Sequence, residues 1–191
     1  LTIGVISTIK FKVSTSIKKL GFKNFLNFMR KIYHKIQMMN NKINVYEFLL
    51  DSNNKEKSKY FHCIENYSDF VSLYRKLKHP IKRYHYNRFR KGDSFYCLLE
   101  DNNLYCSGWS TSKDMYVSEI DKTLMADGKV ILYDYHTPEE FRRKGKYQEL
   151  LESIISYLNS DVFIYALTNN IASNRAIQKV GFQKSMKQQL R

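Results

Sequence analysis

The sequence predicts an α/β domain in which a mixed, mostly antiparallel β-sheet is flanked by helices. Two observations support this prediction. The segment from Val130 to Phe182 alternates strand-like and helix-like patterns, and residues 93–110 contain two apolar segments joined by a short, turn-rich link. The composition agrees, because 43% of the 191 residues are hydrophobic and 15% are aromatic, which suffices for one packed core.

The N-terminal region predicts an additional amphipathic helix between Ser16 and Met39. Its apolar residues recur at steps of three and four, namely Phe22, Phe25, Met29, Ile32 and Ile36. Residues 1–46 carry nine Lys/Arg and no Asp/Glu. Three interpretations stay open: an accessory helix packed on the domain, an interfacial helix on anionic lipid, or a transit peptide. We therefore divide the chain into a basic helical extension, residues 1–42, and a domain, residues 43–191.

The elements of the domain follow in order. Strands are predicted at Ile43–Leu50, Asp93–Leu99, Leu104–Ser110, Val130–Thr137 and Asp161–Leu167, with a short last strand from Phe182. Helices are predicted at Asp69–Leu77, Gly145–Tyr157 and Ala172–Val180. Ser68 is the expected N-cap of the first helix and Gly181 the expected C-cap of the last.

The charge and the cysteines limit the classes of function. A formal charge of +14 suggests an anionic partner, which could be a nucleotide, a nucleic acid or an acidic membrane surface. Cys63, Cys97 and Cys106 lack zinc-site spacing, and we interpret them as free thiols in a reducing, cytoplasmic setting. Cys97 and Cys106 would face each other only if Asp101 and Asn102 form a two-residue turn that aligns them. We expect no metal, and no apolar run reaches the length of a membrane span.

The basic loop Arg142–Tyr147 is the most informative segment. It lies between a β-branched, aromatic strand and an amphipathic helix, and it contains Gly145. A loop of this kind presents backbone N–H groups and the positive end of a helix dipole to an anion. The sequence therefore predicts a phosphate-binding loop here.

A second segment, from Asn170 to Phe182, gives the first one a family context. Together the two resemble the GNAT acetyltransferases, whose Gln/Arg-x-x-Gly-x-Gly/Ala loop binds the pyrophosphate of acetyl-CoA. Arg142 and Gly145 match the first two defined positions of that loop, and Tyr147 stands where the family has a small residue. The second family pattern, Asn, a short helix and Gly-Phe, matches at Asn170, Ser173, Gly181 and Phe182. The resemblance covers roughly Val130 to Lys184.

The resemblance implies a GNAT-like fold and acetyl-CoA as the acyl donor. It places the pyrophosphate on Arg142, Arg143, Lys144, Gly145, Lys146 and Tyr147, and the thioester carbonyl on a backbone N–H among Tyr135, His136 and Thr137. Asn170 and Ser173 would line the pantetheine arm. For Asn170 and Ser173, helix capping is an equally compatible role.

Two departures from the family pattern concern its acid and its last strand. Ile177 stands where many members carry a tyrosine that acts as general acid. The family's sheet ends with two strands after the second helix, whereas nine residues follow Phe182 here. Three explanations of this shortened C-terminus stay open. The family's final strand is missing, it is contributed from elsewhere in the chain, or it is lost through truncation.

The candidate general bases are Asp134 and His136, which lie two residues apart and so share one face of a regular strand. Glu100 and Glu119 are weaker candidates. Residues 75–91 hold eight Lys/Arg, no acid and three aromatic residues, Tyr84, Tyr86 and Phe89, and we expect them to border the acceptor.

The sequence thus predicts an N-acetyltransferase that acts on a small amine. An amino sugar or a nucleotide-linked amino sugar is favoured as the acceptor over other amines. We expect a cytoplasmic enzyme that can lie on an anionic membrane surface through its N-terminal helix. As a partner we favour a small-molecule amine over nucleic acid. The alternative is a basic RNA- or membrane-binding module with a degenerate acetyltransferase fold.

Overall fold

The computed structural model describes residues 24, 26–30, 41–49, 56–185 and 190–191. The chain divides into two compact units. One comprises residues 1–41 with 118–121, and the other comprises residues 42–117 with 122–191. In the first unit, residues 24 and 26–30 are helical. The rest of the predicted helix Ser16–Met39 lies outside the described residues.

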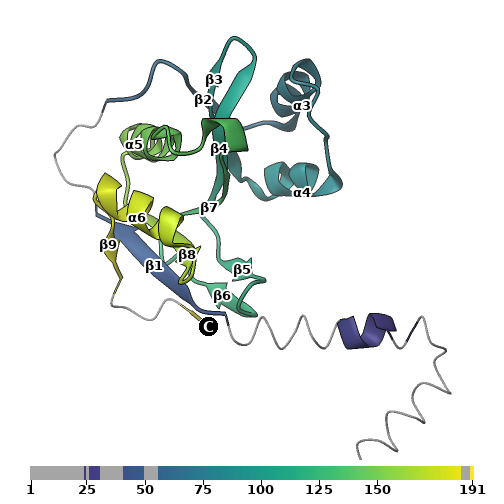
Figure 1. The fold of residues 1–191 in the computed structure, drawn as a ribbon, viewed down its shortest axis with the longest axis vertical. Helices are drawn as coiled ribbons and strands as arrows, with labels where there is room; N and C mark the ends of the chain where they lie inside the picture. Colours follow the sequence, from purple (N-terminus) through teal and green to yellow (C-terminus); the bar gives the residue numbers. More distant parts are fainter. Residues whose placement is uncertain (1–23, 25, 31–40, 50–55, 186–189) are drawn as a thin grey trace, which may run out of the picture. The chain divides into compact units, whose positions relative to one another are not determined.

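Among the described residues, the second unit is built on a seven-stranded sheet with the order β2-β3-β4-β7-β8-β1-β9 (Figure 1). Its strands are β1 (Ile43–Phe48), β2 (Phe61–Ile64), β3 (Ser94–Glu100), β4 (Asn103–Thr111), β7 (Val130–His136), β8 (Val162–Leu167) and β9 (Gln183–Lys184). Neighbouring strands pair antiparallel, except that β7 and β8 run parallel. The prediction of a mixed, mostly antiparallel sheet is confirmed. A separate ribbon pairs β5 (Met115–Val117) with β6 (Lys122–Leu124).

The first strand in the described residues, β1, lies between β8 and β9 in the sheet. All six of its residues pair antiparallel with β8, from Ile43 opposite Leu167 to Phe48 opposite Val162, and its other edge pairs with β9. Only the short β9 follows the last helix in the described part of the chain. Among the described residues, the edge of β8 that does not face β7 is therefore covered by a strand from the N-terminal side of the domain.

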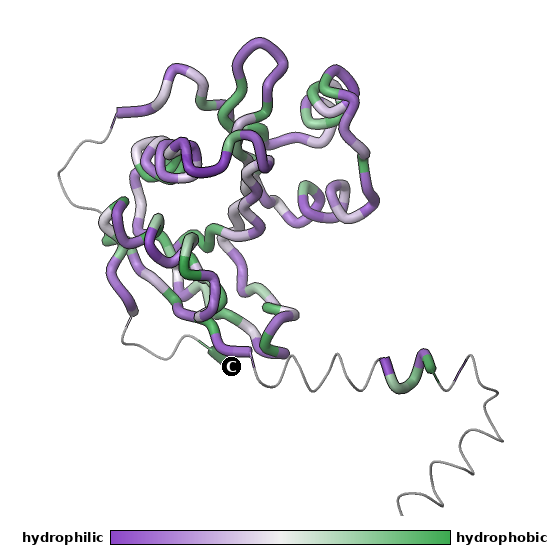
Figure 2. The backbone as a smooth tube through the Cα atoms, viewed as in Figure 1, coloured by the Kyte–Doolittle hydropathy of each residue, from purple (hydrophilic) through white to green (hydrophobic). Residues whose placement is uncertain are grey.

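Helices cover both faces of the sheet (Figure 1). Helices α5 (Lys146–Leu158) and α6 (Ile171–Val180) share one apolar core, which includes Leu151 and Ile177. Helices α3 (Tyr67–Lys76) and α4 (Arg83–Lys91) pack on the aromatic core of the other face, around Phe70 and Trp109. The loops that connect these elements are largely hydrophilic, as Figure 2 shows. The two cores hold the sheet from both sides.

The structure differs from the sequence analysis at two helices. The N-cap of α3 is Asn66, whose Oδ1 accepts a hydrogen bond from the N–H of Asp69 at 2.9 Å, and Ser68 donates its hydroxyl to the same oxygen at 2.7 Å. The prediction of Ser68 as the cap is wrong because the amide oxygen of Asn66 takes this role two residues earlier. Helix α4 was not predicted, since its N-cap residue is Lys82, which lacks a capping oxygen. No helix in the described residues is long and apolar enough to cross a membrane.

The β3–β4 hairpin turns through Asp101 and Asn102, whose φ angles of 48° and 63° confirm the two-residue turn. The register places Cys97 opposite Ser107 rather than opposite Cys106. The two buried thiols belong to the cores on opposite faces of the sheet, so they do not pair. The prediction of free thiols is confirmed. Burial raises the pKa of each to about 12, which favours the protonated thiol at neutral pH.

Candidate functional site

The parallel strands β7 and β8 separate along their length. They pair at three positions, from Val130 opposite Val162 to Leu132 opposite Ile164, whereas β7 continues to His136 and β8 to Leu167. The two strands thus diverge at their carboxyl ends, where α5 and α6 follow. Ligands of α/β sheets bind at the carboxyl ends of parallel strands.

A cavity of about 670 Å³ lies where β7 ends and the two helices begin. Its lining includes ten of the eleven residues predicted to bind the cofactor: Tyr135, His136, Thr137, Arg142, Arg143, Gly145, Lys146, Tyr147, Asn170 and Ser173. The eleventh, Lys144, is not part of the lining, and its ammonium lies 5.7 Å from the ring centre of Phe141. The two motifs that are distant in the sequence therefore meet in one cavity.

The loop between β7 and α5 has the backbone of an anion site. Arg143 and Gly145 both have left-handed φ angles, 61° and 73°, a conformation that occurs in backbone turns whose N–H groups bind anions. Gly145 is the N-cap of α5 and has no side-chain cap, so the N–H groups of residues 146–148 lack intrahelical acceptors. A Cβ on Gly145 would meet no atom within 4 Å, and glycine is needed there for its φ angle.

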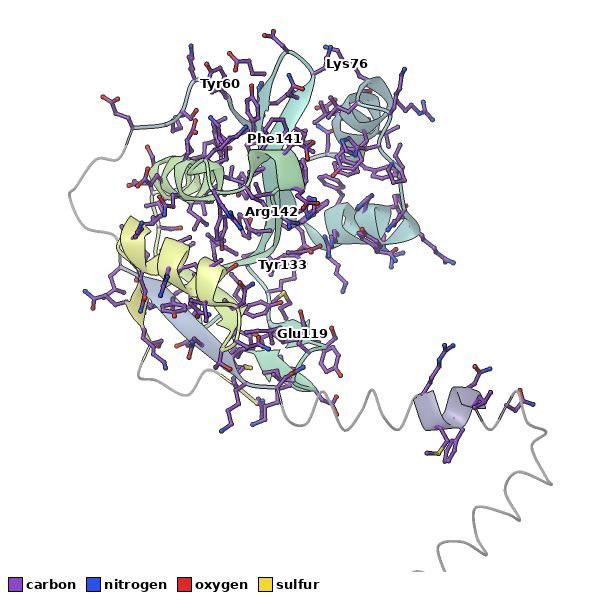
Figure 3. The ribbon with its side chains drawn as sticks, in the orientation of Figure 1. Tyr60, Lys76, Glu119, Tyr133, Phe141 and Arg142 are labelled. Carbon is purple, nitrogen blue, oxygen red and sulfur yellow. The ribbon has the colours of Figure 1, made fainter. Side chains whose placement is uncertain are left out.

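The basic side chains of this loop differ in what they contact. Arg142, labelled with Phe141 in Figure 3, donates from Nε to the carbonyl of Thr137 at 3.1 Å. Lys146 instead donates to Glu149 at 2.8 Å and lies 4.8 Å from the ring centre of Tyr105. The charge of Lys146 is thus partly neutralised by Glu149, while Arg142 holds the loop against the end of β7.

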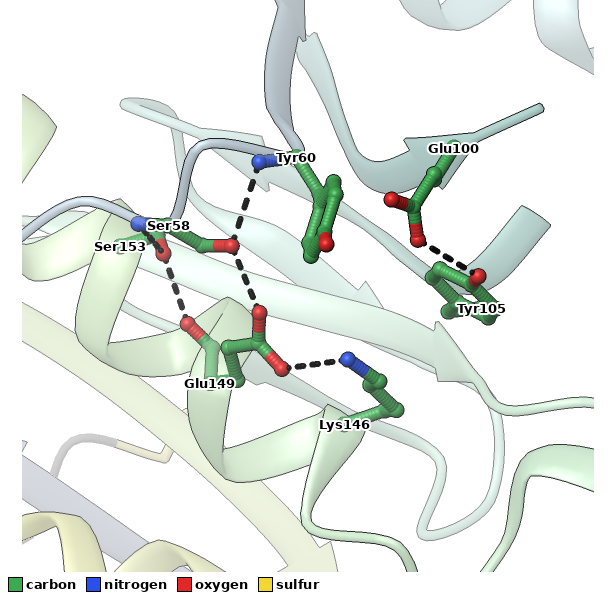
Figure 4. A network of polar contacts seen from close by, with 7 residues as sticks. All are labelled: Ser58, Tyr60, Glu100, Tyr105, Lys146, Glu149 and Ser153. Atoms are coloured by element: carbon green, nitrogen blue, oxygen red, sulfur yellow. Dashed lines mark hydrogen bonds and ion pairs between the residues drawn. The ribbon is translucent and has the colours of Figure 1, made fainter. Parts of the chain in front are cut away.

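Glu149 is the centre of a polar network that anchors the start of α5 (Figure 4). Its carboxylate accepts from the hydroxyl of Ser58 at 2.6 Å, and its carbonyl accepts from Ser153 at 2.7 Å. The hydroxyl of Ser58 also accepts the N–H of Tyr60 at 3.2 Å. The segment before β2 is therefore tied to the helix whose N-terminus opens into the cavity.

A β-bulge in β7 determines which side chains reach the cavity. Trp109 lies opposite Tyr133 and Ser107 opposite His136, so Gly108 alone faces both Asp134 and Tyr135. Asp134 adopts a left-handed φ of 53°. As a result Tyr133 joins the aromatic core of α3 and α4, whereas Tyr135 joins the core of α5.

Tyr135 occupies the space that the bulge and Gly108 create. A Cβ on Gly108 would lie 2.3 Å from Cε1 of the Tyr135 ring, so only glycine fits beneath this ring. The hydroxyl of Tyr135 is buried without a hydrogen-bond partner among the described residues. Burial raises its pKa well above the usual value, and the nearby Tyr147 adds to that rise. The hydroxyl is therefore neutral.

Tyr147, the unusual residue of the loop motif, turns its ring into the core. Its ring centre lies 5.5 Å from that of Tyr135, and burial raises the pKa of Tyr147. A large residue is accommodated at this position because its ring packs against the apolar core.

The candidate bases lie in different environments. His136 is exposed and lines the cavity. Asp134 does not line it, and its carboxylate lies 2.7 Å from Nη1 of Arg88 in α4. Glu100 also lies outside the lining, where its carboxylate accepts from Tyr105 at 2.9 Å. Glu119, in the other unit, accepts from the hydroxyl of Ser118 at 3.1 Å.

The start of α6 forms the opposite wall. Asn170 caps this helix, since its Oδ1 accepts the N–H of Ser173 at 3.1 Å. Ile177, at the position of the family's tyrosine acid, is fully buried in the core. The lining residues that the sequence analysis missed are Phe141, Gln148, Ala172 and Ala176. Helical spacing from Ser173 would have indicated Ala176, whose small side chain leaves the wall open.

Asn174, one residue beyond the recognised motif, joins α6 to β1. Its side-chain oxygen accepts from Asn44 at 2.9 Å and from the hydroxyl of Tyr46 at 2.7 Å. Its amide donates to the carbonyls of Leu167 and Asn170, at 2.8 and 2.7 Å. The described part of the chain contains no group of three or more His, Cys, Asp or Glu residues that could hold a metal ion.

Comparison with solved structures assigns the fold. A structure described as an acetyltransferase of the GNAT family from Novosphingobium aromaticivorans matches with a TM-score of 0.50 and 12% identity, over 75% of this chain and 61% of that one. The fold is that of the GNAT acetyltransferases. No protein-family model matches the chain, and no curated protein sequence does either.

Two further structures are similar at lower scores. A GNAT-family acetyltransferase from Colwellia psychrerythraea matches with a TM-score of 0.47 and 14% identity, over 85% of this chain and 59% of that one. The aminoglycoside N-acetyltransferase AAC(6')-Iy, in complex with CoA, matches with a TM-score of 0.46 and 14% identity, over 67% and 94%. The chain thus spans about three fifths of the length of the two GNAT-family structures, and the fold assignment rests on the first of the three.

Proposed function

We propose that this chain is an acetyl-CoA-dependent N-acetyltransferase that acts on a small amine. One observation carries the proposal: the uncapped N-terminus of α5 opens into a cavity of about 670 Å³ beside two diverging parallel strands. Uncapped N–H groups at the positive end of a helix dipole favour phosphate. The GNAT fold of the domain supports the same proposal.

The proposed donor site uses backbone groups first and side chains second. The N–H groups of residues 144–147 would hold the pyrophosphate of acetyl-CoA, and Arg142 and Arg143 would add positive charge. Asn170 and Ser173 would line the pantetheine arm along the opposite wall. Bound acetyl-CoA would supply an acyl group activated as a thioester.

The residues around the thioester would act mainly by positioning. A backbone N–H among residues 135–137 would donate to the thioester carbonyl oxygen, and His136 would accept the proton that the amine loses, directly or through water. The amine nitrogen forms a bond to the carbonyl carbon, the carbon–sulfur bond breaks, and the thiolate leaves. Because Ile177 is buried and apolar, the departing thiolate receives no proton from that position.

His136 is the favoured base because it lines the cavity, whereas Asp134 is bound in an ion pair with Arg88. For the acceptor we propose an amino sugar or a nucleotide-linked amino sugar. We further propose a cytoplasmic protein in which residues 1–42 form a basic extension of the catalytic domain.

Thermal unfolding with acetyl-CoA and CoA tests the donor site. At about 100 times the dissociation constant, bound ligand stabilises by about 2.7 kcal/mol, which for a chain of this size raises Tm by about 5 to 10 °C. Gly145→Glu should abolish that rise, since it adds a negative side chain at the phosphate site.

Gly128→Glu is the matched control. Gly128 has a φ of 76°, close to the 73° of Gly145, and a Cβ there also meets open space, yet it does not line the cavity. Both variants carry the same backbone strain and charge, so only Gly145→Glu should lose the shift. Equal shifts in the two variants would rule out this loop as the phosphate site. The absence of any shift in the unchanged protein would instead favour the binding-module alternative.

A further inference from the structure

The surface of α3 and α4 away from the sheet is strongly positive. Seven exposed cations lie on the end of α3, the connecting loop and α4, and we call them the α3–α4 basic surface: Arg75, Lys76, Lys78, Lys82, Arg83, Arg90 and Lys91. None of the seven forms an ion pair with another described residue. No Asp or Glu occurs between residues 75 and 91. The surface therefore has a positive charge that no ion pair among the described residues balances.

The orientation of α4 adds to this field. Its first turn contains no acidic residue, and Lys82 and Arg83 lie at its N-terminus, where the helix dipole is also positive. Like charges at this end disfavour the helix, and a bound anion would relieve the repulsion. The charge distribution thus suits a polyanion that extends along the helix.

Two exposed tyrosines stand among these cations. The side chains of Tyr84 and Tyr86 are 44% and 48% exposed. The Tyr84 ring centre lies 5.7 Å from the ammonium of Lys82 and 4.9 Å from the guanidinium of Arg88, and the Tyr86 ring packs at 5.2 Å against Tyr67. The rings are therefore held in place while much of their surface stays open to solvent.

The inner side of α4 makes the surface rigid. The guanidinium of Arg88 lies 4.8 and 5.0 Å from the ring centres of Trp109 and Tyr133 and pairs with Asp134. His85 is buried against Phe70 and Trp109. These contacts fix α4 on the sheet, so its outer side chains are displayed in a preorganised arrangement.

We propose that the α3–α4 basic surface binds single-stranded nucleic acid, with its cations contacting phosphates and Tyr84 and Tyr86 stacking on bases. Such binding combines a basic track with exposed aromatic rings. A lipid surface fits less well, because the exposed apolar side chains of α4 are two tyrosines rather than a stripe of aliphatic residues. The sequence analysis favoured small molecules over nucleic acid as partners, and this proposal adds single-stranded nucleic acid as a second ligand at a separate surface. The proposal does not rest on the acetyltransferase activity.

The test is fluorescence anisotropy of the full chain with labelled 12-nucleotide single-stranded RNA and DNA across a salt series. If about five phosphates are neutralised, the slope of log K against log salt is about −3.5, and affinity falls about 100-fold between 50 and 200 mM salt. Arg83→Ala/Arg90→Ala/Lys91→Ala should reduce the slope by about 2. Tyr84→Leu and Tyr86→Leu should each weaken binding about tenfold and leave the slope unchanged, since stacking releases no counterions.

A matched triple variant controls for net charge. Lys122→Ala/Lys179→Ala/Lys184→Ala removes three exposed cations from other elements and should leave the slope unchanged. Equal losses in the two triple variants would refute the surface. Unchanged affinity in both tyrosine variants would refute base stacking, and binding to phosphatidylserine vesicles without binding to either strand would assign the surface to lipid. The Tm rise with acetyl-CoA, measured on the same variants, separates this outcome from failure of the proposed enzyme.

Discussion

We expect acid to destabilise this domain through His85, which fixes α4 to the sheet. The imidazole is 5% exposed, and its Nδ1 accepts the N–H of Lys82 at 3.2 Å, so the ring is neutral in the folded protein. Burial lowers the pKa of His85 to about 4, with the charges of Arg88 and Lys82 contributing. In the unfolded chain the pKa returns to its usual 6.5.

The sign follows from proton binding in the two states. Between pH 6.5 and pH 4 the unfolded chain holds a proton on His85 that the folded protein does not, so stability falls as the pH falls through this window. Each pKa unit corresponds to about 1.4 kcal/mol, and some access of water to the ring reduces the total. The free energy of unfolding should therefore drop by about 2 to 3 kcal/mol between pH 7 and pH 4.5 on account of this residue.

Urea unfolding at several pH values measures the effect, with His85→Gln as the comparison. Glutamine at this position can accept the N–H of Lys82 but takes up no proton. Subtracting the pH dependence of the variant removes the contribution of the carboxylates, which titrate in both proteins. Parallel pH profiles for the two proteins, or a steeper acid loss in the variant, would refute the reasoning.

Two further predictions concern packing. Gly108→Ala should destabilise by about 2 kcal/mol in urea unfolding, because the new methyl group clashes with the Tyr135 ring, and adding Tyr135→Leu should recover part of the loss. Asn174→Leu should cost about 1 to 3 kcal/mol, since it removes the side-chain acceptor of the buried Tyr46 hydroxyl, while the carbonyls of Leu167 and Asn170 keep their backbone donors. Gln178→Ala on the exposed side of α6 should change stability by less than about 0.5 kcal/mol.

The parts of the fold that the sequence predicted depend on local chemistry. The turn at Asp101 and Asn102, the helix C-cap at Gly181 and the loop at Gly145 each require a residue that tolerates a left-handed backbone, and each was recognised from that residue. Local chemistry predicted the phosphate loop, and the resemblance of two short motifs to the GNAT family supplied the other predicted residues; ten of the eleven line the cavity.

The parts that the sequence did not predict depend on contacts between distant residues. The bulge at Asp134 has no glycine to mark it, and it becomes visible only where Gly108 lies opposite two residues. Helix α4 starts without a capping oxygen, and its inner side is held by Arg88, whose aromatic partners come from three different elements. Neither signal exists within a short window of sequence.

The position of β1 connects these long-range contacts to the proposed site. Strand β8 pairs with β1 along all six of its residues but with β7 along only three. The β1 edge therefore supplies the hydrogen bonds that keep β8 extended to Leu167, while its other edge is free to separate from β7 beyond Ile164. Because Asn174 bonds to both β1 and the start of α6, the same contacts fix the helix that forms one wall of the cavity. A strand from the N-terminal side of the domain thus supports an opening built mainly from its C-terminal half.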